Sequence, residues 1–255
     1  GKSPAMVAAS TSLLIVCVFS ADQAEEVLFG IDGAAETLPK GGTVVMCTTM
    51  APEHSRDIAA RLEKHGHQFI DAPITGGKRG ADQGSLTVIA SGSDEAMAAA
   101  DGAFKAMGGR VYHVGDSPGA GSTVKMINQL LVGVHVVAAA EAMALATKAG
   151  ADPQTVYDVI THGGGNSVVF ESRVPYMLTE DYAPRGVVDI FIKDLGIVAD
   201  AARSLPFPLP LATAALQQFL SASASGYGRS DDASVVKVYE QLAGTNVAAA
   251  AKVKH

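Results

Sequence analysis

A lysine within a long apolar stretch is the residue best suited to proton-transfer chemistry in this chain. Residues 116–131 read DSPGAGSTVKMINQLL, and the apolar pattern continues to residue 149. As a helix that begins near residue 120, this stretch has roughly 30 residues and is about 45 Å long. Helical spacing places Ser122, Asn128 and Gln129 on the same face as Lys125.

Spacing alone leaves two interpretations of Lys125 open. Burial in apolar surroundings lowers the pKa of an amine from its usual value of about 10.4, so that its neutral form can accept the proton of an alcohol. Alternatively, the side chain extends past its apolar neighbours to water near the start of the helix. A catalytic role also requires groups that hold a substrate close to the amine.

A glycine-containing loop at residues 71–77, with the sequence DAPITGG, could hold a carboxylate. The backbone N–H groups of Gly76 and Gly77 and the hydroxyl of Thr75 can form a cradle, because glycine lets a ligand approach the backbone closely. Taken alone, the loop has a plain turn as its alternative interpretation. Asn128 or Gln129 could bind the same carboxylate or a hydroxyl of the substrate.

The elements around these residues indicate a parallel sheet covered by helices. Strands are expected at 13–19, 43–47, 67–71, 85–90 and 110–114, and helices at 21–29, 52–65 and 94–107. The first strand is continuously apolar, which is typical of burial on both faces. Residues 1–10 are expected to be loop or the tail of a preceding element. Phe19, Ser20 and Thr49 follow the first two strands, where ligands bind in such sheets.

The second half of the chain is predicted to be all-helical. Beyond the long helix, helices are expected from Asp152 to the glycines at 163–165, over 186–205, to about residue 224, and after a cap at Asp231 or Asp232. We therefore expect a nucleotide-binding α/β domain at 1–117, incomplete at its N-terminus, and a long interdomain helix plus an all-α domain at 118–255.

The glycine fingerprint of dinucleotide-binding sheets does not follow the first strand-like run. Because the G-x-G-x-x-G turn normally precedes the other strands, we expect a longer chain with roughly 60–70 further N-terminal residues. The choice between NAD and NADP stays open, since the residue that contacts the ribose would also be upstream.

Composition excludes several classes of partner. The net charge of −7 and the lack of a basic patch argue against nucleic acid, and every long apolar run contains polar residues, which argues against a membrane span. Cys17 and Cys47 are expected to be buried thiols in a reducing compartment, so we expect a cytoplasmic protein. No histidine has metal-ligand spacing, so no metal is assigned.

Together, the motifs resemble those of the β-hydroxyacid dehydrogenase family, which includes 3-hydroxyisobutyrate dehydrogenase. The resemblance covers essentially the whole chain. The matching positions are the loop at 71–77, with Thr75 in place of the family's serine; Gly119, Gly121 and Lys125 in G-x-G-x-x-x-K; and Lys193, Asp194 and Leu195 in K-D-L.

This resemblance implies oxidation of a small hydroxy acid by NAD or NADP, with NAD favoured and Lys125 as general acid and base. It implies cofactor contacts from Phe19, Ser20, Thr49, Phe191 and Lys193, and substrate contacts from Thr75, Gly76, Gly77, Asn128, Gln129 and Asn166. Residues 161–173, 188–196 and 207–212, together with Gln129, imply L-threonate as substrate. The alternatives are a tartronate semialdehyde or 3-hydroxyisobutyrate type of dehydrogenase, or a non-catalytic binding or oligomerisation relative. A homo-oligomer, such as a dimer, is expected.

Overall fold

The computed structural model describes residues 1–252 of the 255-residue chain. Contacts divide the chain into two compact units, Gly1–Ile127 and Asn128–His255, which we call unit 1 and unit 2. The helix α6 (Ala120–Lys148) continues from one unit into the other. The boundary predicted at residue 117 lies before this helix and stays a prediction.

Unit 1 alternates strands and helices, as the sequence pattern predicted. Its elements are α1 (Pro4–Ala8), β1 (Leu13–Val16), α2 (Ala21–Phe29), β2 (Thr43–Met46), α3 (Pro52–Lys64), β3 (Gln68–Asp71), β4 (Ile74–Thr75), α4 (Gly77–Asp82), β5 (Leu86–Ala90), α5 (Asp94–Met107) and β6 (Gly108–His113). The first turns of α6 belong to the same unit.

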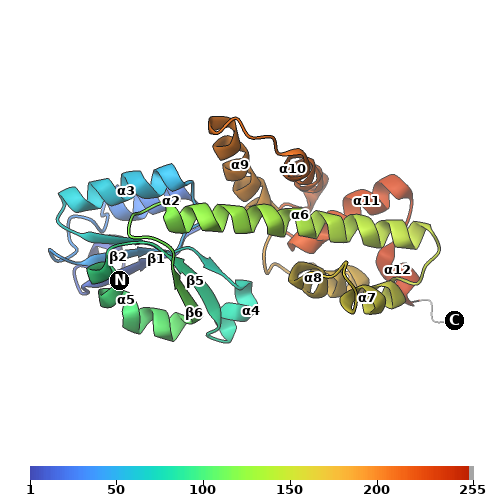
Figure 1. Ribbon diagram of the computed structural model, residues 1–255, viewed down its shortest axis with the longest axis horizontal. Coiled ribbons are helices and arrows are strands. Elements are labelled where there is room, and N and C mark those ends of the chain that lie inside the picture. Colours follow the sequence, from blue (N-terminus) through green and yellow to red (C-terminus); the bar gives the residue numbers. More distant parts are fainter. Residues whose placement is uncertain (253–255) are drawn as a thin grey trace. The chain divides into compact units, whose positions relative to one another are not determined.

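The strands of unit 1 form two three-stranded sheets that meet at β3 and β5 (Figure 1). In the order β1-β2-β3 all pairs are parallel, and β5 and β6 are also parallel. Only the short β4 runs antiparallel, beside β5. An isolated bridge between Asp71 and Ser91 joins the two sheets. This is the predicted Rossmann-type α/β class, with β4 as an antiparallel addition.

Alternate residues of β2 divide the core of unit 1 into two halves. Val44 and Met46 pack with α2 and α3, whereas Val45 packs with α5, as does Cys47 directly after the strand. Figure 1 shows α2 and α3 on one face of the sheet and α5 on the other. Because helices cover both faces of the sheet, ligands can reach it at the ends of its strands. In such folds they bind at the carboxyl ends.

The first strand differs from its prediction. β1 ends at Val16 rather than at residue 19, and Ile15 is 40% exposed. Cys17 is also exposed, so only Cys47 is the buried thiol that the sequence predicted. Among the strands of residues 1–252, β1 pairs with β2.

Residues 1–10 were predicted to be loop or the tail of a preceding element, and they contain the short helix α1. Ser3 caps it by accepting a hydrogen bond from the Met6 N–H, and Pro4 occupies its first position. A cap residue followed by proline is a signal for the start of a helix. The helix was missed because it has only five residues.

Unit 2 is all-helical, as predicted. Its elements after α6 are α7 (Pro153–Thr161), α8 (Val168–Thr179), α9 (Val188–Ser204), α10 (Pro210–Ala222), a π-helical turn (Ser223–Tyr227), a 3₁₀ turn (Asp232–Val235), α11 (Val236–Ala243) and α12 (Val247–Lys252). In residues 128–252 the only strand-like feature is a single bridge between Val187 and Asp231. Helices α9 and α10 lie side by side (Figure 1).

Two features of unit 2 were not predicted. Helix α8 is capped by Ser167 and contains Pro175, which breaks the usual helix pattern. Asp231 caps a 3₁₀ turn rather than the last helix, and α11 and α12 follow it.

By length and composition alone α6 could cross a membrane, a property shared by buried helices of globular proteins.

Candidate active site

The predicted cofactor residues of unit 1 lie after the carboxyl ends of neighbouring parallel strands. Phe19 and Ser20 follow β1, and Thr49 follows β2. Phe19 is 45% exposed, and Ser20 caps α2 by accepting from the Gln23 N–H. Because β1 and β2 are adjacent and parallel, these groups share one edge of the sheet. An exposed aromatic ring and two hydroxyls suit contacts with a nicotinamide nucleotide.

The loop after β3 reaches the same edge and exposes its backbone. Thr75 is half-buried in β4, while Gly76 and Gly77 are exposed. Their φ angles are 124° and 59°, in the region that favours glycine. A Cβ on Gly76 would also lie 3.3 Å from the side chain of Leu86. The residues predicted as a carboxylate cradle therefore combine accessible backbone with conformations that other residues rarely adopt.

Asp71 connects this loop to the first turn of α6. Its Oδ2 accepts hydrogen bonds from the backbone N–H groups of Gly119 at 3.0 Å and Ser122 at 2.7 Å, and its Oδ1 accepts from the Ser122 hydroxyl at 2.7 Å. Burial raises the pKa of Asp71, and the hydrogen bonds from Ser122 and Gly119 oppose that shift. The carboxylate thus satisfies N–H groups that a helix start leaves without partners.

The glycines before Lys125 allow this close approach. Gly119 has a φ of 94°. A Cβ on Gly121 would lie 2.6 Å from the carbonyl oxygens of both Asp71 and Ile89. The G-x-G part of the motif is therefore explained by packing of the helix start against β3 and β5.

Lys125 lies one turn after Ser122 and is only 6% exposed. A lysine that extends to water would have an exposed side chain, so its burial favours the catalytic interpretation over the solvated one.

In unit 2, the predicted residues Asn128, Gln129 and Lys193 belong to one hydrogen-bonded chain. Asn128 Nδ2 donates to Gln129 Oε1 at 2.9 Å, and Gln129 Nε2 donates to Asp194 Oδ2 at 2.5 Å. Lys193 Nζ donates to Asp194 Oδ1 at 2.6 Å. Gln129 and Asp194 are both buried. The amide of Gln129 therefore has protein partners at both ends.

Sequence reasoning noted Asp194 in the K-D-L motif but did not name it as a site residue. A signal was present, because Asp194 lies between Phe191 and Val198 at the spacing of the buried stripe of α9. A carboxylate on a buried stripe needs hydrogen-bond partners.

Phe191 and Gly133 fix the packing of α6 against α9 within unit 2. Phe191 is buried and stacks on Phe219 with ring centroids 4.9 Å apart. A Cβ on Gly133 would lie 3.1 Å from Leu195 and 3.2 Å from Phe191. Phe191, predicted as a cofactor contact, thus has most of its ring in the core of unit 2.

Asn166 and His162 lie between α7 and α8. Asn166 Nδ2 donates to the Thr161 carbonyl at 3.1 Å and to Glu171 Oε1 at 2.6 Å. Its buried Oδ1 has no protein partner. His162 is exposed and is the C-cap of α7.

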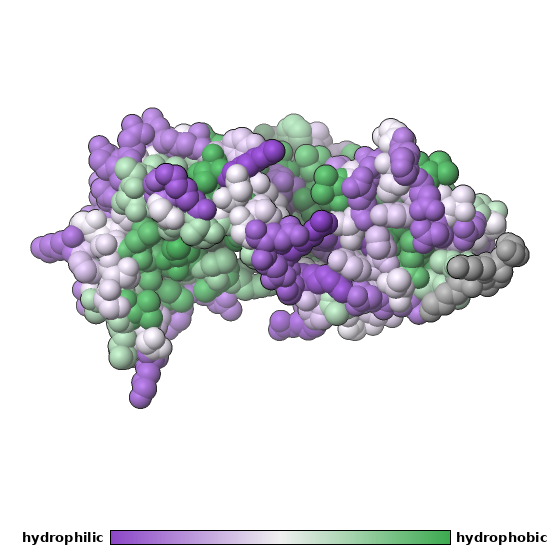
Figure 2. Space-filling view, turned by 90° about the horizontal axis from the view of Figure 1, so that it is seen from below, coloured by the Kyte–Doolittle hydropathy of each residue, from purple (hydrophilic) through white to green (hydrophobic). Residues whose placement is uncertain are grey.

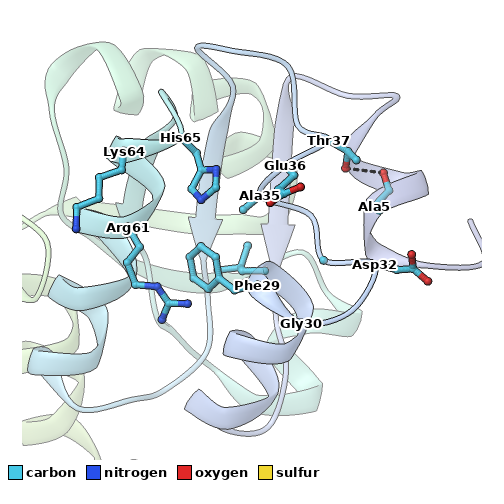
Figure 3. A pocket seen from close by; sticks show the side chains of 12 residues that line it. Ala5, Phe29, Gly30, Asp32, Ala35, Glu36, Thr37, Arg61, Lys64 and His65 are labelled. Atoms are coloured by element: carbon cyan, nitrogen blue, oxygen red, sulfur yellow. Dashed lines mark hydrogen bonds between the residues drawn. The ribbon is translucent and has the colours of Figure 1, made fainter.

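Two hollows of unit 1 lie away from these residues. The cavity in Figure 3, of about 540 Å³, is lined by residues of α1, the end of α2, the end of α3 and residues 30–37. Arg61 lies over the Phe29 ring at 3.7 Å, with His65 next to it. These segments precede β2 and β3, so the cavity is at the amino edge of the sheet. A second hollow, lined by Met97, Phe104 and Val111 among others, lies on the α5 side, where Figure 2 shows hydrophobic surface.

No cluster of three or more potential metal ligands is present in residues 1–252.

Comparisons with known proteins identify the family. Residues 119–239 match a family described as "NAD-binding of NADP-dependent 3-hydroxyisobutyrate dehydrogenase", and residues 1–115 match the NAD-binding domain of 6-phosphogluconate dehydrogenase. The chain is 47% identical over 237 residues to L-threonate dehydrogenase of Cupriavidus necator, covering 93% of this chain and 80% of that protein. The chain belongs to the β-hydroxyacid dehydrogenase family.

Two further relatives agree with this assignment. The crystal structure of 3-hydroxyisobutyrate dehydrogenase from Salmonella typhimurium has a TM-score of 0.88 at 47% identity and covers 92% of this chain and 82% of its own. 2-(Hydroxymethyl)glutarate dehydrogenase of Eubacterium barkeri is 32% identical over 94% of this chain and 80% of its own length. The chain is thus an NAD(P)-dependent hydroxyacid dehydrogenase with the Rossmann and all-α organisation of its family, as the motifs implied.

Proposed function

We propose that this dehydrogenase oxidises L-threonate at C2 to 2-dehydro-L-erythronate, with Lys125 as the general base. The observation that carries the proposal is the burial of Lys125 on a helix whose first turn is bonded, through Asp71, to the loop of Gly76 and Gly77. The 47% identity to an L-threonate dehydrogenase supports the choice of substrate.

The substrate carboxylate is held by Thr75, Gly76 and Gly77. Exposed backbone N–H groups at glycine positions can approach a carboxylate closely, and the Thr75 hydroxyl can donate a further hydrogen bond. Binding the carboxylate through this loop orients the neighbouring C2 toward the helix to which Asp71 is bonded. Holding the substrate in the reactive orientation lowers the activation free energy, because the base and the substrate no longer have to meet by diffusion.

Lys125 removes the proton of the C2 hydroxyl. In the proposed step the O–H bond breaks toward Lys125 Nζ and the C2–O bond becomes a carbonyl. A nicotinamide cofactor bound to this site would supply the acceptor for the hydride that is lost from C2. In the reverse reaction the lysine ammonium returns the proton to the oxygen. A base of this kind contributes about 10²–10⁴-fold to the rate.

The remaining hydroxyls of L-threonate need polar partners, for which Asn128, Gln129 and Asn166 are the candidates. The buried Oδ1 of Asn166 has no protein partner and could accept a hydrogen bond from a hydroxyl. A site that hydrogen-bonds hydroxyls rejects an analogue lacking them by up to about 10⁴-fold, because its own polar groups would stay unpaired. The cofactor contacts proposed for Phe19, Ser20 and Thr49 belong to unit 1, and those proposed for Phe191 and Lys193 belong to unit 2.

A 3-hydroxyisobutyrate or tartronate semialdehyde specificity is the second candidate. It is favoured by the solved relative named 3-hydroxyisobutyrate dehydrogenase, which is also 47% identical to this chain. The same loop and lysine could serve that reaction. The choice between the two candidate functions therefore depends on the residues that contact the part of the substrate farthest from its carboxylate.

The test is a panel of hydroxy acids assayed with NAD and with NADP. We expect the highest kcat/KM for L-threonate and a much lower value for 3-hydroxyisobutyrate, which carries a methyl group. A higher kcat/KM for 3-hydroxyisobutyrate or for tartronate semialdehyde reduction would contradict the L-threonate assignment in favour of the second candidate. The same panel decides whether NAD is the preferred cofactor.

We also propose a cytoplasmic homo-oligomer. Phe207, Leu211 and Leu145 are 63%, 70% and 67% exposed on unit 2, and association would cover such apolar side chains. Both cysteines are free thiols, which suits a reducing compartment. Light scattering at micromolar concentration should give a mass above that of one chain, and a monomer would contradict the oligomer.

A further inference from the structure

Asp194 is a buried carboxylate to which the proposed mechanism gives no role. It is 2% exposed, and its two oxygens accept from Lys193 Nζ and Gln129 Nε2. A buried ion pair contributes little net stability compared with a well-packed apolar replacement, so it is weak support for folding alone. What this carboxylate does better than an apolar group is to orient hydrogen-bond donors.

The carboxylate fixes the direction of two amides in series. An ionised carboxylate only accepts hydrogen bonds, so the end of Gln129 that faces Asp194 must be the NH₂ group. Its Oε1 then faces Asn128, and the end of Asn128 that faces Gln129 must also be NH₂. Amide orientation is ambiguous without such a partner, and here the charge of Asp194 decides it.

This polarity favours one of the two roles that the sequence left open for the amide pair. With its Nδ2 held toward Gln129, Asn128 directs its Oδ1 acceptor away from that contact. An acceptor suits a hydroxyl proton and repels a carboxylate. The arrangement therefore favours recognition of a substrate hydroxyl by Asn128, while the carboxylate of the substrate is left to the glycine loop.

The contact between Gln129 and Asp194 depends on side-chain length and on close helix packing. Asparagine is one methylene shorter than glutamine, so at position 129 it could not keep bonds of 2.5 Å and 2.9 Å to two partners. Gly133 lies one turn further along α6. A Cβ at this position would be only 3.1 Å from the Leu195 side chain, so the absence of a side chain allows α9 to pack closely against α6. Glutamine at 129, glycine at 133 and aspartate at 194 thus form one arrangement.

We propose that Asp194 is a positioning residue of this dehydrogenase: by orienting Gln129, it makes Asn128 the acceptor for a hydroxyl of the substrate. The inference rests on the proposed function for the identity of the substrate. The hydrogen-bond chain itself lies within unit 2 and can be observed without catalysis.

The test exchanges donors and acceptors along the chain. In Asp194→Asn, Lys193 still requires an acceptor, so the introduced NH₂ group faces Gln129 and forces both amides to turn over. We expect the ratio of kcat/KM for L-threonate to kcat/KM for 3-hydroxyisobutyrate to fall by at least about 10-fold. Gln129→Glu alone sets two carboxylates against each other and should lower the same ratio.

In the double variant Gln129→Glu with Asp194→Asn, every hydrogen-bond donor of the chain again faces an acceptor. The introduced carboxylate accepts from Asn128 and from the introduced amide, and the amide oxygen accepts from Lys193. We expect the ratio to return to within about 3-fold of the parent. Val198→Ala, a buried position one turn further along α9, should reduce stability and leave the ratio unchanged.

Two kinetic results would overturn the inference. One is an unchanged ratio in Asp194→Asn, with only stability reduced; the other is a double variant no better than either single one. Side-chain amide NMR signals of Asn128 and Gln129 give a readout independent of activity. They should shift in Asp194→Asn and return toward the parent positions in the double variant, and unshifted signals would also overturn it. If the parent oxidises no hydroxy acid, the proposed function fails, whereas the NMR result still decides the role of Asp194.

Discussion

Asp71 holds Ser122 through both of its carboxylate oxygens: Oδ1 accepts from the Ser122 hydroxyl and Oδ2 from the Ser122 N–H, each at 2.7 Å. Asp71 is the last residue of β3 and begins the loop that leads to Gly76 and Gly77. Ser122 lies one turn before Lys125. The candidate carboxylate cradle and the helix that carries the candidate base are therefore joined within unit 1 by one buried carboxylate.

Removal of that carboxylate should destabilise the start of α6. In Asp71→Ala the N–H groups of Gly119 and Ser122 lose their acceptor in a buried setting, and each unsatisfied group costs about 1–3 kcal/mol. We expect urea denaturation to show a free energy of unfolding lower by at least about 2 kcal/mol. Asp82→Ala, at an exposed residue paired with Lys78, is the control and should change it by less than about 0.5 kcal/mol. Equal effects of the two substitutions would refute the anchoring role of Asp71.

A methyl group at Gly121 should displace the same helix. Its Cβ would lie 2.6 Å from two carbonyl oxygens, so Gly121→Ala should lower both the melting temperature and kcat. The matched control is Gly102→Ala in α5, where nothing lies within 4 Å of the added Cβ. Alanine there should stabilise the helix by about 0.5–1 kcal/mol. If Gly121→Ala melts at or above the parent temperature, the close approach described above is wrong.

The stability of the dehydrogenase should depend on pH through Asp232. Burial raises the pKa of Asp232 to about 6, although the charge and hydrogen bonds of Arg173 oppose the shift. The folded state thus keeps this proton to higher pH than the unfolded state does. The stabilisation is complete below about pH 4 and is lost as the pH rises through 6, a change on the order of 3 kcal/mol.

Urea titrations at pH 4.5 and pH 7 can isolate this contribution. In Asp232→Asn the loss between the two pH values should be smaller than in the parent, even though the variant is less stable overall because Arg173 loses its partner. Asp200→Asn, at an exposed residue paired with Arg203, should keep the parent's pH dependence. The same dependence in parent and Asp232→Asn would show that Asp232 does not titrate in this range.

Much of the fold could be predicted because local signals agreed with tertiary structure. Helices α2 and α5 have the predicted bounds, and α6 begins and ends within a residue or so of its prediction. Helix caps such as Ser93 and a regular spacing of apolar residues depend only on neighbouring residues, so both can be recognised in the sequence. The three motifs likewise indicated the family that the comparisons then showed.

The rest depended on contacts that a single sequence does not display. β1 ends at Val16, although its apolar run continues to residue 19, so the run alone does not show where the strand stops. Helix α8 was missed because Pro175 interrupts its pattern. The role of Asp194 appears only once Gly133 brings α9 against α6, since a lysine-aspartate pair on a helix is usually solvated.

The central claim is that Lys125 accepts the proton of the substrate hydroxyl, and the most direct measurement is kcat for Lys125→Ala with L-threonate. We predict a fall of about 10²–10⁴-fold, with cofactor affinity within a few-fold of the parent. Lys148→Ala, at an exposed lysine in the last turn of the same helix, should keep parental turnover. A kcat for Lys125→Ala within a few-fold of the parent would contradict the account and remove Lys125 from the mechanism.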